Sequence, residues 1–89
     1  MSESSWFVYI IQTVKNRLYT GITTDVERRF QEHKGDLPRG AKFFRSDKPE
    51  KVVYLEACQT RSDALIREAQ IKRLSRVQKE NFIKAHQNG

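Results

Sequence analysis

The chain has 89 residues, with 17 Lys or Arg against 11 Asp or Glu, so its formal net charge at pH 7 is +6. A chain this short builds one small hydrophobic core, which excludes two catalytic domains. The single cysteine, Cys58, rules out an internal disulfide, and the longest apolar run, Trp6 to Ile11, has six residues and argues against a membrane span.

We therefore expect a single domain over residues 1–89, with its core at about residues 6–84 and short polar termini. Met1 to Ser5 is polar and shows no basic segment followed by an apolar stretch, so we expect no targeting signal and a cytoplasmic location. No pair of thiols or imidazoles has zinc-finger spacing, which argues against structural zinc.

The excess of positive charge favours a polyanionic partner, because neutralising phosphates releases their condensed counterions. An ordinary solvated basic surface is the alternative. The segment from Arg28 to Lys51 holds eight of the 17 basic residues, interleaved with Phe30, Phe43 and Phe44. Such a mixture suits contacts with a nucleic-acid backbone together with stacking on bases.

The first two predicted strands form a β-hairpin. Residues 6–11 and 18–23 are rich in β-branched and aromatic side chains, and a polar run separates them. If the loop leaves an odd number of residues between paired positions, Tyr9 comes directly opposite Tyr19 and both rings share one face of the sheet. Otherwise the rings point apart unless a bulge intervenes.

A helix is predicted after this hairpin. Thr24 carries a hydroxyl and Glu27 follows three positions later, a pattern that starts helices because the two side chains satisfy free amide groups reciprocally. The helix should run to about Lys34 and end at Gly35.

The same helix has one face that should meet the sheet. Val26 and Phe30 define its apolar stripe, and Arg29 and His33 lie beside that stripe, one helical turn apart. The other charged side chains are expected to point elsewhere: Glu27, Arg28 and Glu32. Arg29 and His33 are therefore predicted to be neighbours near the sheet.

Residues 35–50 contain two glycines, two prolines and many charged side chains, which predicts an exposed, mobile loop or a short broken helix. Residues 51–57 then read as a third strand. Thr60 or Ser62 can cap a helix over about residues 63–74, and a shorter helix should follow Ser75, over about residues 77–86.

One carboxylate occupies an unusual place in the predicted helix 63–74. Glu68 falls in the middle of an apolar stripe formed by Ala64, Leu65 and Ile71. Burying an unpaired carboxylate costs several kcal/mol, so Glu68 should be protonated, paired or bound to a cation. Three alternatives remain open: an ion pair with Lys72 or Arg29, a metal-binding or catalytic role, or an error in the helix register.

The order of these residues resembles a known family. The triplets Val8-Tyr9-Ile10 and Tyr19-Thr20-Gly21 have tyrosines ten positions apart, and Arg29, His33 and Glu68 follow. Each triplet is weakly diagnostic by itself, but the ordered set is specific. Over roughly residues 6–83 the chain resembles the GIY-YIG nuclease superfamily, and within it the small stand-alone bacterial proteins.

The resemblance implies a fold and an activity. The fold is an α/β (α+β) domain in which helices flank a small three-stranded antiparallel sheet, in the order β-β-α-β-α-α. The implied activity is metal-dependent endonuclease cleavage of DNA phosphodiester bonds. It would select DNA by structure and act in DNA repair or processing. A non-catalytic nucleic-acid-binding module with the same fold is the alternative, and a basic protein-interaction domain is a third.

The resemblance also assigns catalytic roles. Glu68 would ligate Mg²⁺ or Mn²⁺, Arg29 would hold the scissile phosphate, and Tyr9, Tyr19 and His33 would position or deprotonate the attacking water. A hard cation that keeps several waters needs few protein carboxylates, and Arg presents a planar fork to phosphate oxygens. A phenol has an ordinary pKa near 10, so a tyrosine base needs help from a positive charge such as Arg29. These side chains should converge on one accessible concavity.

Substrate contacts are expected from basic side chains. The candidates are Lys42, Arg45, Lys72 and Lys79. Phe43 and Phe44 replace the polar residues common in the small relatives, and as exposed aromatics they would stack on unpaired bases or wedge at a DNA junction. The chain leaves no room for a separate recognition domain, so the shape of branched or single-stranded DNA, or a protein partner, would supply selectivity.

Overall fold

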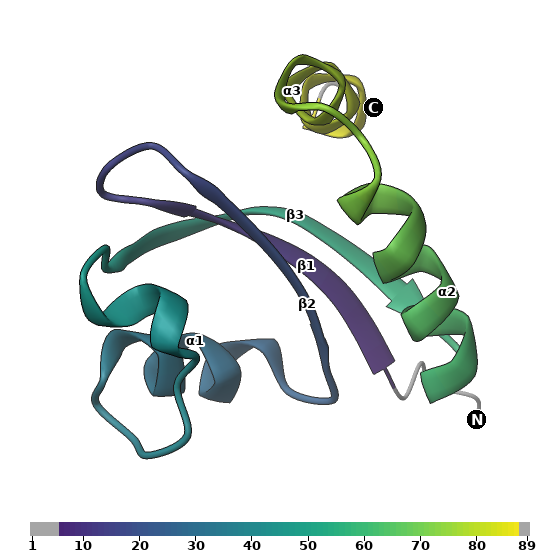
Figure 1. Cartoon of the computed structure of the whole chain (residues 1–89). Helices are drawn as coiled ribbons and strands as arrows, with labels where there is room; N and C mark the ends of the chain where they lie inside the picture. The colour runs from purple at the N-terminus through teal and green to yellow at the C-terminus, as the bar shows by residue number, and fades with distance from the viewer. Residues whose placement is uncertain (1–5, 88–89) are drawn as a thin grey trace.

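The computed structural model describes residues 6–87, so the polar stretch Met1–Ser5 lies outside the described residues. The elements follow in the order β1 (Trp6–Thr13), β2 (Leu18–Thr23), α1 (Val26–Lys34), the short 3-10 helix η1 (Lys42–Arg45), β3 (Pro49–Cys58), α2 (Arg61–Lys72) and α3 (Arg76–Gln87) (Figure 1). The strands form one antiparallel sheet in the order β2-β1-β3. The predicted α/β fold and its element order are confirmed.

Helices cover both faces of this sheet. In Figure 1, α1 lies below the curved sheet, α3 lies above it and α2 runs along one side. Alternate residues of β1 serve the two faces, as the two-residue period of a strand requires. Val8 and Ile10 pack with residues of α2 and α3, whereas Tyr9 and Ile11 pack with Phe44 of η1 on the α1 side.

The hairpin register differs from one expectation. Tyr9 pairs with Gly21, and Tyr19 pairs with Ile11, so the two tyrosines are not directly opposite each other. Because Gly21 and Tyr19 are two residues apart, Tyr19 is the diagonal neighbour of Tyr9 on the same face. Their ring centroids are 6.4 Å apart, so the prediction that the rings share a face is confirmed.

The helix boundaries lie close to the predicted ones. The N-cap of α1 is Asp25 and not Thr24, because the Asp25 carboxylate accepts the Arg28 N–H at 3.1 Å. Gly35 ends α1 with φ 94°, the left-handed conformation that favours glycine. Thr60 caps α2 by accepting the Asp63 N–H at 3.0 Å.

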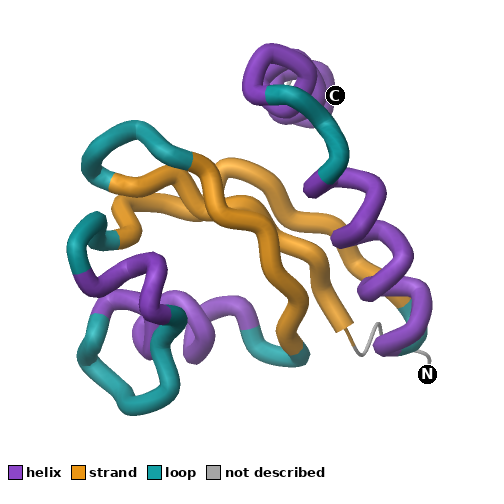
Figure 2. The backbone as a smooth tube through the Cα atoms, in the orientation of Figure 1, coloured by secondary structure: helices purple, strands orange, loops and turns teal. Residues whose placement is uncertain are grey.

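The second half of the loop after α1 has two buried side chains among exposed ones. A short helix, η1, interrupts the loop, as the predicted alternative of a short broken helix has it (Figure 2). Phe44 and Asp47 are each only 1% exposed, so the expectation of an exposed segment is wrong at these two positions. Asp47 accepts hydrogen bonds from the Thr13 hydroxyl at 2.6 Å, the Lys15 amide at 3.0 Å and Arg17 Nε at 2.8 Å. A carboxylate with three donors can be buried without remaining unpaired, so this loop is fastened to the β1–β2 turn.

Among residues 6–87, no helix combines the length and the apolar character needed to cross a lipid bilayer.

Candidate active site

Tyr9 is the buried centre of the candidate site. Its side chain extends over its cross-strand partner Gly21, and Tyr9 is 2% exposed. A Cβ added at Gly21 would lie 2.7 Å from Cζ of the Tyr9 ring, closer than atoms can pack. The glycine of the second triplet therefore makes room for the tyrosine of the first.

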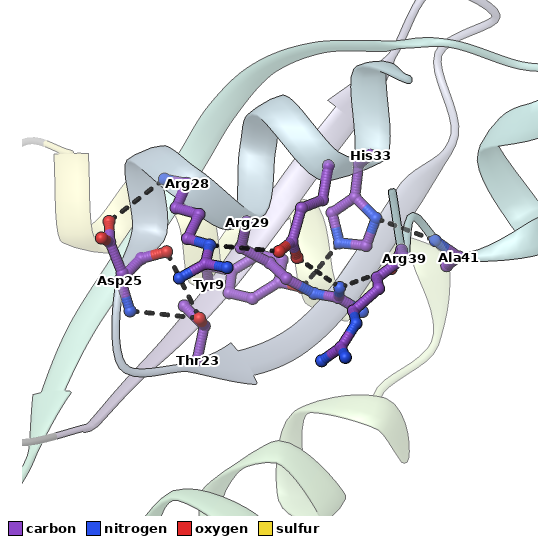
Figure 3. A network of polar contacts seen from close by, with 9 residues as sticks. Tyr9, Thr23, Asp25, Arg28, Arg29, His33, Arg39 and Ala41 are labelled. Atoms are coloured by element: carbon purple, nitrogen blue, oxygen red, sulfur yellow. Dashed lines mark hydrogen bonds and ion pairs between the residues drawn. The ribbon is translucent and has the colours of Figure 1, made fainter. Parts of the chain in front are cut away.

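His33 reaches Tyr9 from α1. The backbone N–H of Ala41 donates to His33 Nδ1 at 3.2 Å, and His33 Nε2 lies 2.9 Å from the Tyr9 hydroxyl oxygen (Figure 3). A nitrogen that accepts a hydrogen bond carries no proton, so the neutral ring has its proton on Nε2. His33 Nε2 therefore donates to the Tyr9 oxygen, and Tyr9 is the acceptor.

Burial sets the protonation of both rings. It lowers the pKa of His33 to about 4, with the charge of Arg29 acting in the same direction, so the imidazole is neutral at pH 7. Burial also raises the pKa of Tyr9 to about 12; the hydrogen bond and charge of Arg29 lower it, and the charges of Tyr19 and Glu68 raise it. Tyr9 therefore has a donor and a cation close to its oxygen.

Arg29 is held in place beside this pair. Its Nη1 donates to Glu32 Oε1 at 2.7 Å and to the carbonyl oxygen of Arg39 at 2.7 Å. Arg28 Nε lies 3.4 Å from the second carboxylate oxygen of Glu32. The hydrogen bond from Arg29 lowers the pKa of Glu32, which keeps that carboxylate charged. The side chain of Arg29 is 27% exposed, so solvent reaches the guanidinium.

The expectation that Glu32 points away from the site is wrong, because its side chain is only 11% exposed and pairs with Arg29. The periodicity of the helix takes no account of the segment 39–41, which returns over this edge of α1. Gly40 packs so tightly there that a Cβ would lie 3.0 Å from the Glu32 carbonyl carbon and 3.2 Å from His33 Cα. This segment thus brings the Arg39 carbonyl to Arg29 and the Ala41 amide to His33.

Tyr19 completes an aromatic cluster with His33. Their ring centroids are 5.2 Å apart, and Phe44 lies 4.8 Å from Tyr19 and 4.4 Å from His33. Phe44 is buried, so the expectation that it is an exposed stacking surface is wrong. Phe43 is half-buried, 5.2 Å from Tyr19.

Glu68 of α2 lies between the buried residues Ala64 and Ile71, with its side chain 18% exposed. Its Oε2 is 3.2 Å from Lys72 Nζ, so of the two predicted ion pairs the one with Lys72 is present, whereas Arg29 pairs with Glu32. Glu68 is not sealed in the interior, because the side chain of Lys72 is 57% exposed. Its charge raises the pKa of Tyr9, which places it within electrostatic reach of that phenol.

The donor set fits a hard cation with few protein ligands. Within residues 6–87, no group of three or more His, Cys, Asp and Glu side chains could hold a metal ion. A single carboxylate suffices for Mg²⁺ or Mn²⁺ when water fills the other positions. Glu68 is accessible and has only an exposed ammonium group to release, so it can accept such a cation.

The remaining site expectations have mixed outcomes. A pocket of about 360 Å³ beside Arg29 is lined by Trp6, Ile22, Thr23, Thr24, Asp25, Arg28, Glu32 and Arg39. Tyr9, Tyr19 and Glu68 do not line it, so the expected single concavity is not formed by this pocket.

The four basic residues expected to contact substrate lie on three different elements. Lys42 and Arg45 are exposed on η1, whereas Lys72 lies at the end of α2 and the half-buried Lys79 lies on α3. These four basic residues do not form one cluster, because η1 and α3 cover opposite faces of the sheet.

Comparisons with known proteins show a family and relatives to which this chain is similar. Residues 5–81 match the model of the GIY-YIG catalytic domain. A UPF0213 protein of Desulfotalea psychrophila is 46% identical over 96% of this chain and 76% of its own length. The UPF0213 protein YhbQ of Escherichia coli is 45% identical over 88% of this chain and 76% of its own length. The solution structure of a UPF0213 protein from Bacillus halodurans is similar with a TM-score of 0.58 and 35% identity, covering 90% of this chain and 83% of that one.

Proposed function

This chain belongs to the family of GIY-YIG catalytic domains, a nuclease superfamily, and from that premise we propose that it is a metal-dependent endonuclease that hydrolyses phosphodiester bonds in DNA. The observation that carries the proposal is the chain of contacts from the Ala41 amide through His33 to the Tyr9 oxygen, with Arg29 beside it. This arrangement presents a phenol oxygen as an acceptor next to a fixed positive charge.

Arg29 binds the scissile phosphate in this proposal. Its Nη1 is occupied by Glu32 and the Arg39 carbonyl, and Tyr9 is a further partner of the guanidinium, so the remaining N–H groups would bind phosphate oxygens. Because these partners fix the guanidinium before substrate arrives, little reorganisation is needed when negative charge develops on the phosphate. Glu32 and the Arg39 carbonyl are therefore positioning groups for Arg29.

Tyr9 is the general base. Its phenol first loses a proton to solvent, and the phenolate then takes a proton from the water that attacks phosphorus, while the leaving oxygen departs and takes a proton from solvent. The hydrogen bond from His33 Nε2 and the charge of Arg29 stabilise the phenolate. Tyr19, packed against His33, positions the water and the phosphate.

Glu68 would hold Mg²⁺ or Mn²⁺, exchanging its contact with Lys72 for the cation. A bound divalent cation supplies positive charge that stabilises the phosphate oxygens in the transition state. The released Lys72 ammonium then becomes available to the DNA backbone, together with Lys42 and Arg45 on η1.

The proposed substrate is DNA whose shape is recognised, such as a branch, a flap or a single-stranded segment, in DNA repair or processing. The net charge of +6 supports binding to a phosphate backbone, which carries no sequence information by itself. We propose that the protein is cytoplasmic and that its selectivity comes from the shape of the DNA or from a protein partner.

The test compares cleavage of supercoiled, flap and branched DNA with Mg²⁺, Mn²⁺ or EDTA. The intact chain should nick DNA only with metal, and Glu68→Gln and Arg29→Gln should abolish nicking. Glu80→Gln removes the same charge from an exposed carboxylate on α3 and should cut normally. Salt-dependent DNA binding without any cleavage would instead favour a non-catalytic binding module.

A further inference from the structure

Arg17 is rigidly fixed at the tip of the β1–β2 hairpin. Its backbone N–H donates to the Thr13 hydroxyl at 2.8 Å, and its carbonyl accepts the Thr13 N–H at 2.9 Å. Its Nε donates to the buried Asp47 carboxylate at 2.8 Å. Both the main chain and the side chain of Arg17 are thus anchored within the protein.

The guanidinium of Arg17 also lies over an aromatic ring. Its central carbon is 4.4 Å from the ring centroid of Phe43, a cation–π contact. The side chain is nevertheless 50% exposed. Among residues 6–87, Nε alone of the guanidinium nitrogens makes a hydrogen bond, so the two terminal nitrogens remain free for a ligand.

The exposed guanidinium of Arg17 suits a phosphate because folding has already ordered its side chain. Long basic side chains lose considerable conformational freedom when they bind a phosphate. Arg17 has already lost this freedom through folding, so phosphate binding costs it less. The fork of two N–H groups that remains matches two oxygens of a phosphate.

Arg17 lies on the same face of the hairpin as the candidate active site. Arg17 directly precedes β2, in which Tyr19 and Gly21 are spaced by two residues and face the same side, and Tyr9 lies over Gly21. At about 3.3 Å per residue, Arg17 is roughly 13 Å along the chain from Gly21. Phe43, which lies beneath Arg17, also contacts Tyr19. A DNA strand with its scissile phosphate at Arg29 can therefore extend along β2 toward Arg17.

We propose that Arg17 is a preorganised phosphate-binding residue that holds the cleaved DNA strand a few nucleotides from the scissile phosphate. The inference rests on the proposed DNA substrate. Asp47 and Phe43 act as positioning residues, because they contact Arg17 and hold its guanidinium in place. The ligand is a backbone phosphate, so this contact adds affinity without reading base sequence.

The experiment measures DNA affinity in the Tyr9→Phe background, where cleavage does not interfere. Fluorescence anisotropy with a labelled single strand and a labelled duplex is recorded over a series of salt concentrations. Arg17→Gln should weaken binding roughly threefold and reduce the slope of log K against log salt by about 0.7 for the single strand and about 0.9 for the duplex. Lys84→Gln, which removes one exposed charge from α3, should leave the slope unchanged.

Arg17→Lys is the second test variant, for use if Arg17→Gln does not fold, because the lysine ammonium can still pair with Asp47. Lysine keeps the positive charge but lacks the planar fork of two N–H groups, so affinity at a fixed salt concentration should fall while the melting temperature stays near that of the parent. An unchanged slope in Arg17→Gln or, where that variant does not fold, an unchanged affinity in Arg17→Lys would overturn the inference, as would a parent protein that binds neither DNA.

Cleavage assays with Tyr9 intact separate the two proposals. A reduced slope in Arg17→Gln together with no cleavage by the intact chain removes the nuclease proposal and keeps Arg17 as a phosphate site. Normal cleavage by the intact chain with an unchanged slope in Arg17→Gln removes the Arg17 inference alone.

Discussion

The phenol ring of Tyr9 lies against the backbone of Gly21, its partner across the β1–β2 pairing, at a separation that no Cβ could share. The two triplets are thus joined by one contact in which the second supplies space and the first supplies the ring. The backbone of Gly21 is not in the left-handed region, so glycine is needed at this position for its small size.

Replacing Gly21 by alanine should push the Tyr9 ring away from His33. We expect Gly21→Ala to lose about 1–3 kcal/mol of unfolding free energy, the usual cost of overpacking, and most of the cleavage activity. Chemical denaturation and a nicking assay measure the two effects. Gly35→Ala is the matched control: its left-handed φ of 94° costs stability, but its activity should survive. Equal activity losses in both variants would contradict the steric role of Gly21.

The base role of Tyr9 predicts a rise of activity with pH. Because the pKa of Tyr9 is about 12, the phenolate fraction grows through the neutral and alkaline range. We expect kcat/KM to rise about tenfold per pH unit from roughly pH 6 to 8, and Tyr9→Phe to lower kcat by roughly 10²–10⁴-fold. Tyr54→Phe is the control, since Tyr54 also has a pKa of about 12 but lies on the other face of the sheet. A Tyr9→Phe variant with normal kcat would remove this assignment.

Stability should fall in mild acid because of His33. Its pKa is about 4 in the folded protein and 6.5 ordinarily, so the unfolded chain binds the proton more readily between these values. The contribution of neutral His33 is complete above pH 6.5 and is lost as the pH falls toward 4, amounting to about 3 kcal/mol at most. Denaturation of wild type and His33→Gln across this range should show a flatter profile for the variant.

Exposed His86 on α3 provides the control, and His86→Gln should keep the wild-type slope. Nitrogen chemical shifts from NMR should place the proton of His33 on Nε2 at neutral pH. A proton on Nδ1 would contradict the hydrogen bond from Ala41.

The contact between Glu68 and Lys72 should oppose metal binding. Removing the ammonium with Lys72→Gln should lower the Mg²⁺ concentration needed for half-maximal cleavage, and the stability cost should stay below about 0.5 kcal/mol, as for exposed helical ion pairs. Titrations of nicking against Mg²⁺ test this. A higher Mg²⁺ requirement in Lys72→Gln would show that Lys72 does not compete with the cation.

Local patterns were enough to predict the elements and part of the site. The aromatic and β-branched runs, the glycine at position 35 and the hydroxyl at Thr60 act over a few residues, and each boundary that they predicted is close to the observed one. The helical wheel likewise placed Arg29 and His33 toward the sheet correctly, because both face it from a regular helix. The direct pairing of Tyr9 with Tyr19 was wrong, since turn geometry sets the register.

Contacts made by the irregular segment after α1 could not be predicted. Glu32 was assigned to solvent because a wheel shows only the helix itself, whereas Gly40 and its neighbours cover that edge. Phe44 and Asp47 looked exposed because no periodicity marks the buried positions of a loop.

The loop after α1 is attached to the rest of the protein at two points. These attachments divide it into a part that can change in length and a part that cannot. Gly40 fixes its middle to the end of α1, and Asp47 fixes its end to the hairpin. Residues 36–38 lie before both attachments and can accept insertions at little cost, as surface loops usually do. One residue added between 41 and 46 would move either the Ala41 amide away from His33 or the Asp47 carboxylate away from Arg17. Relatives of this protein should therefore vary in length before position 39 and keep a constant spacing from 40 to 47.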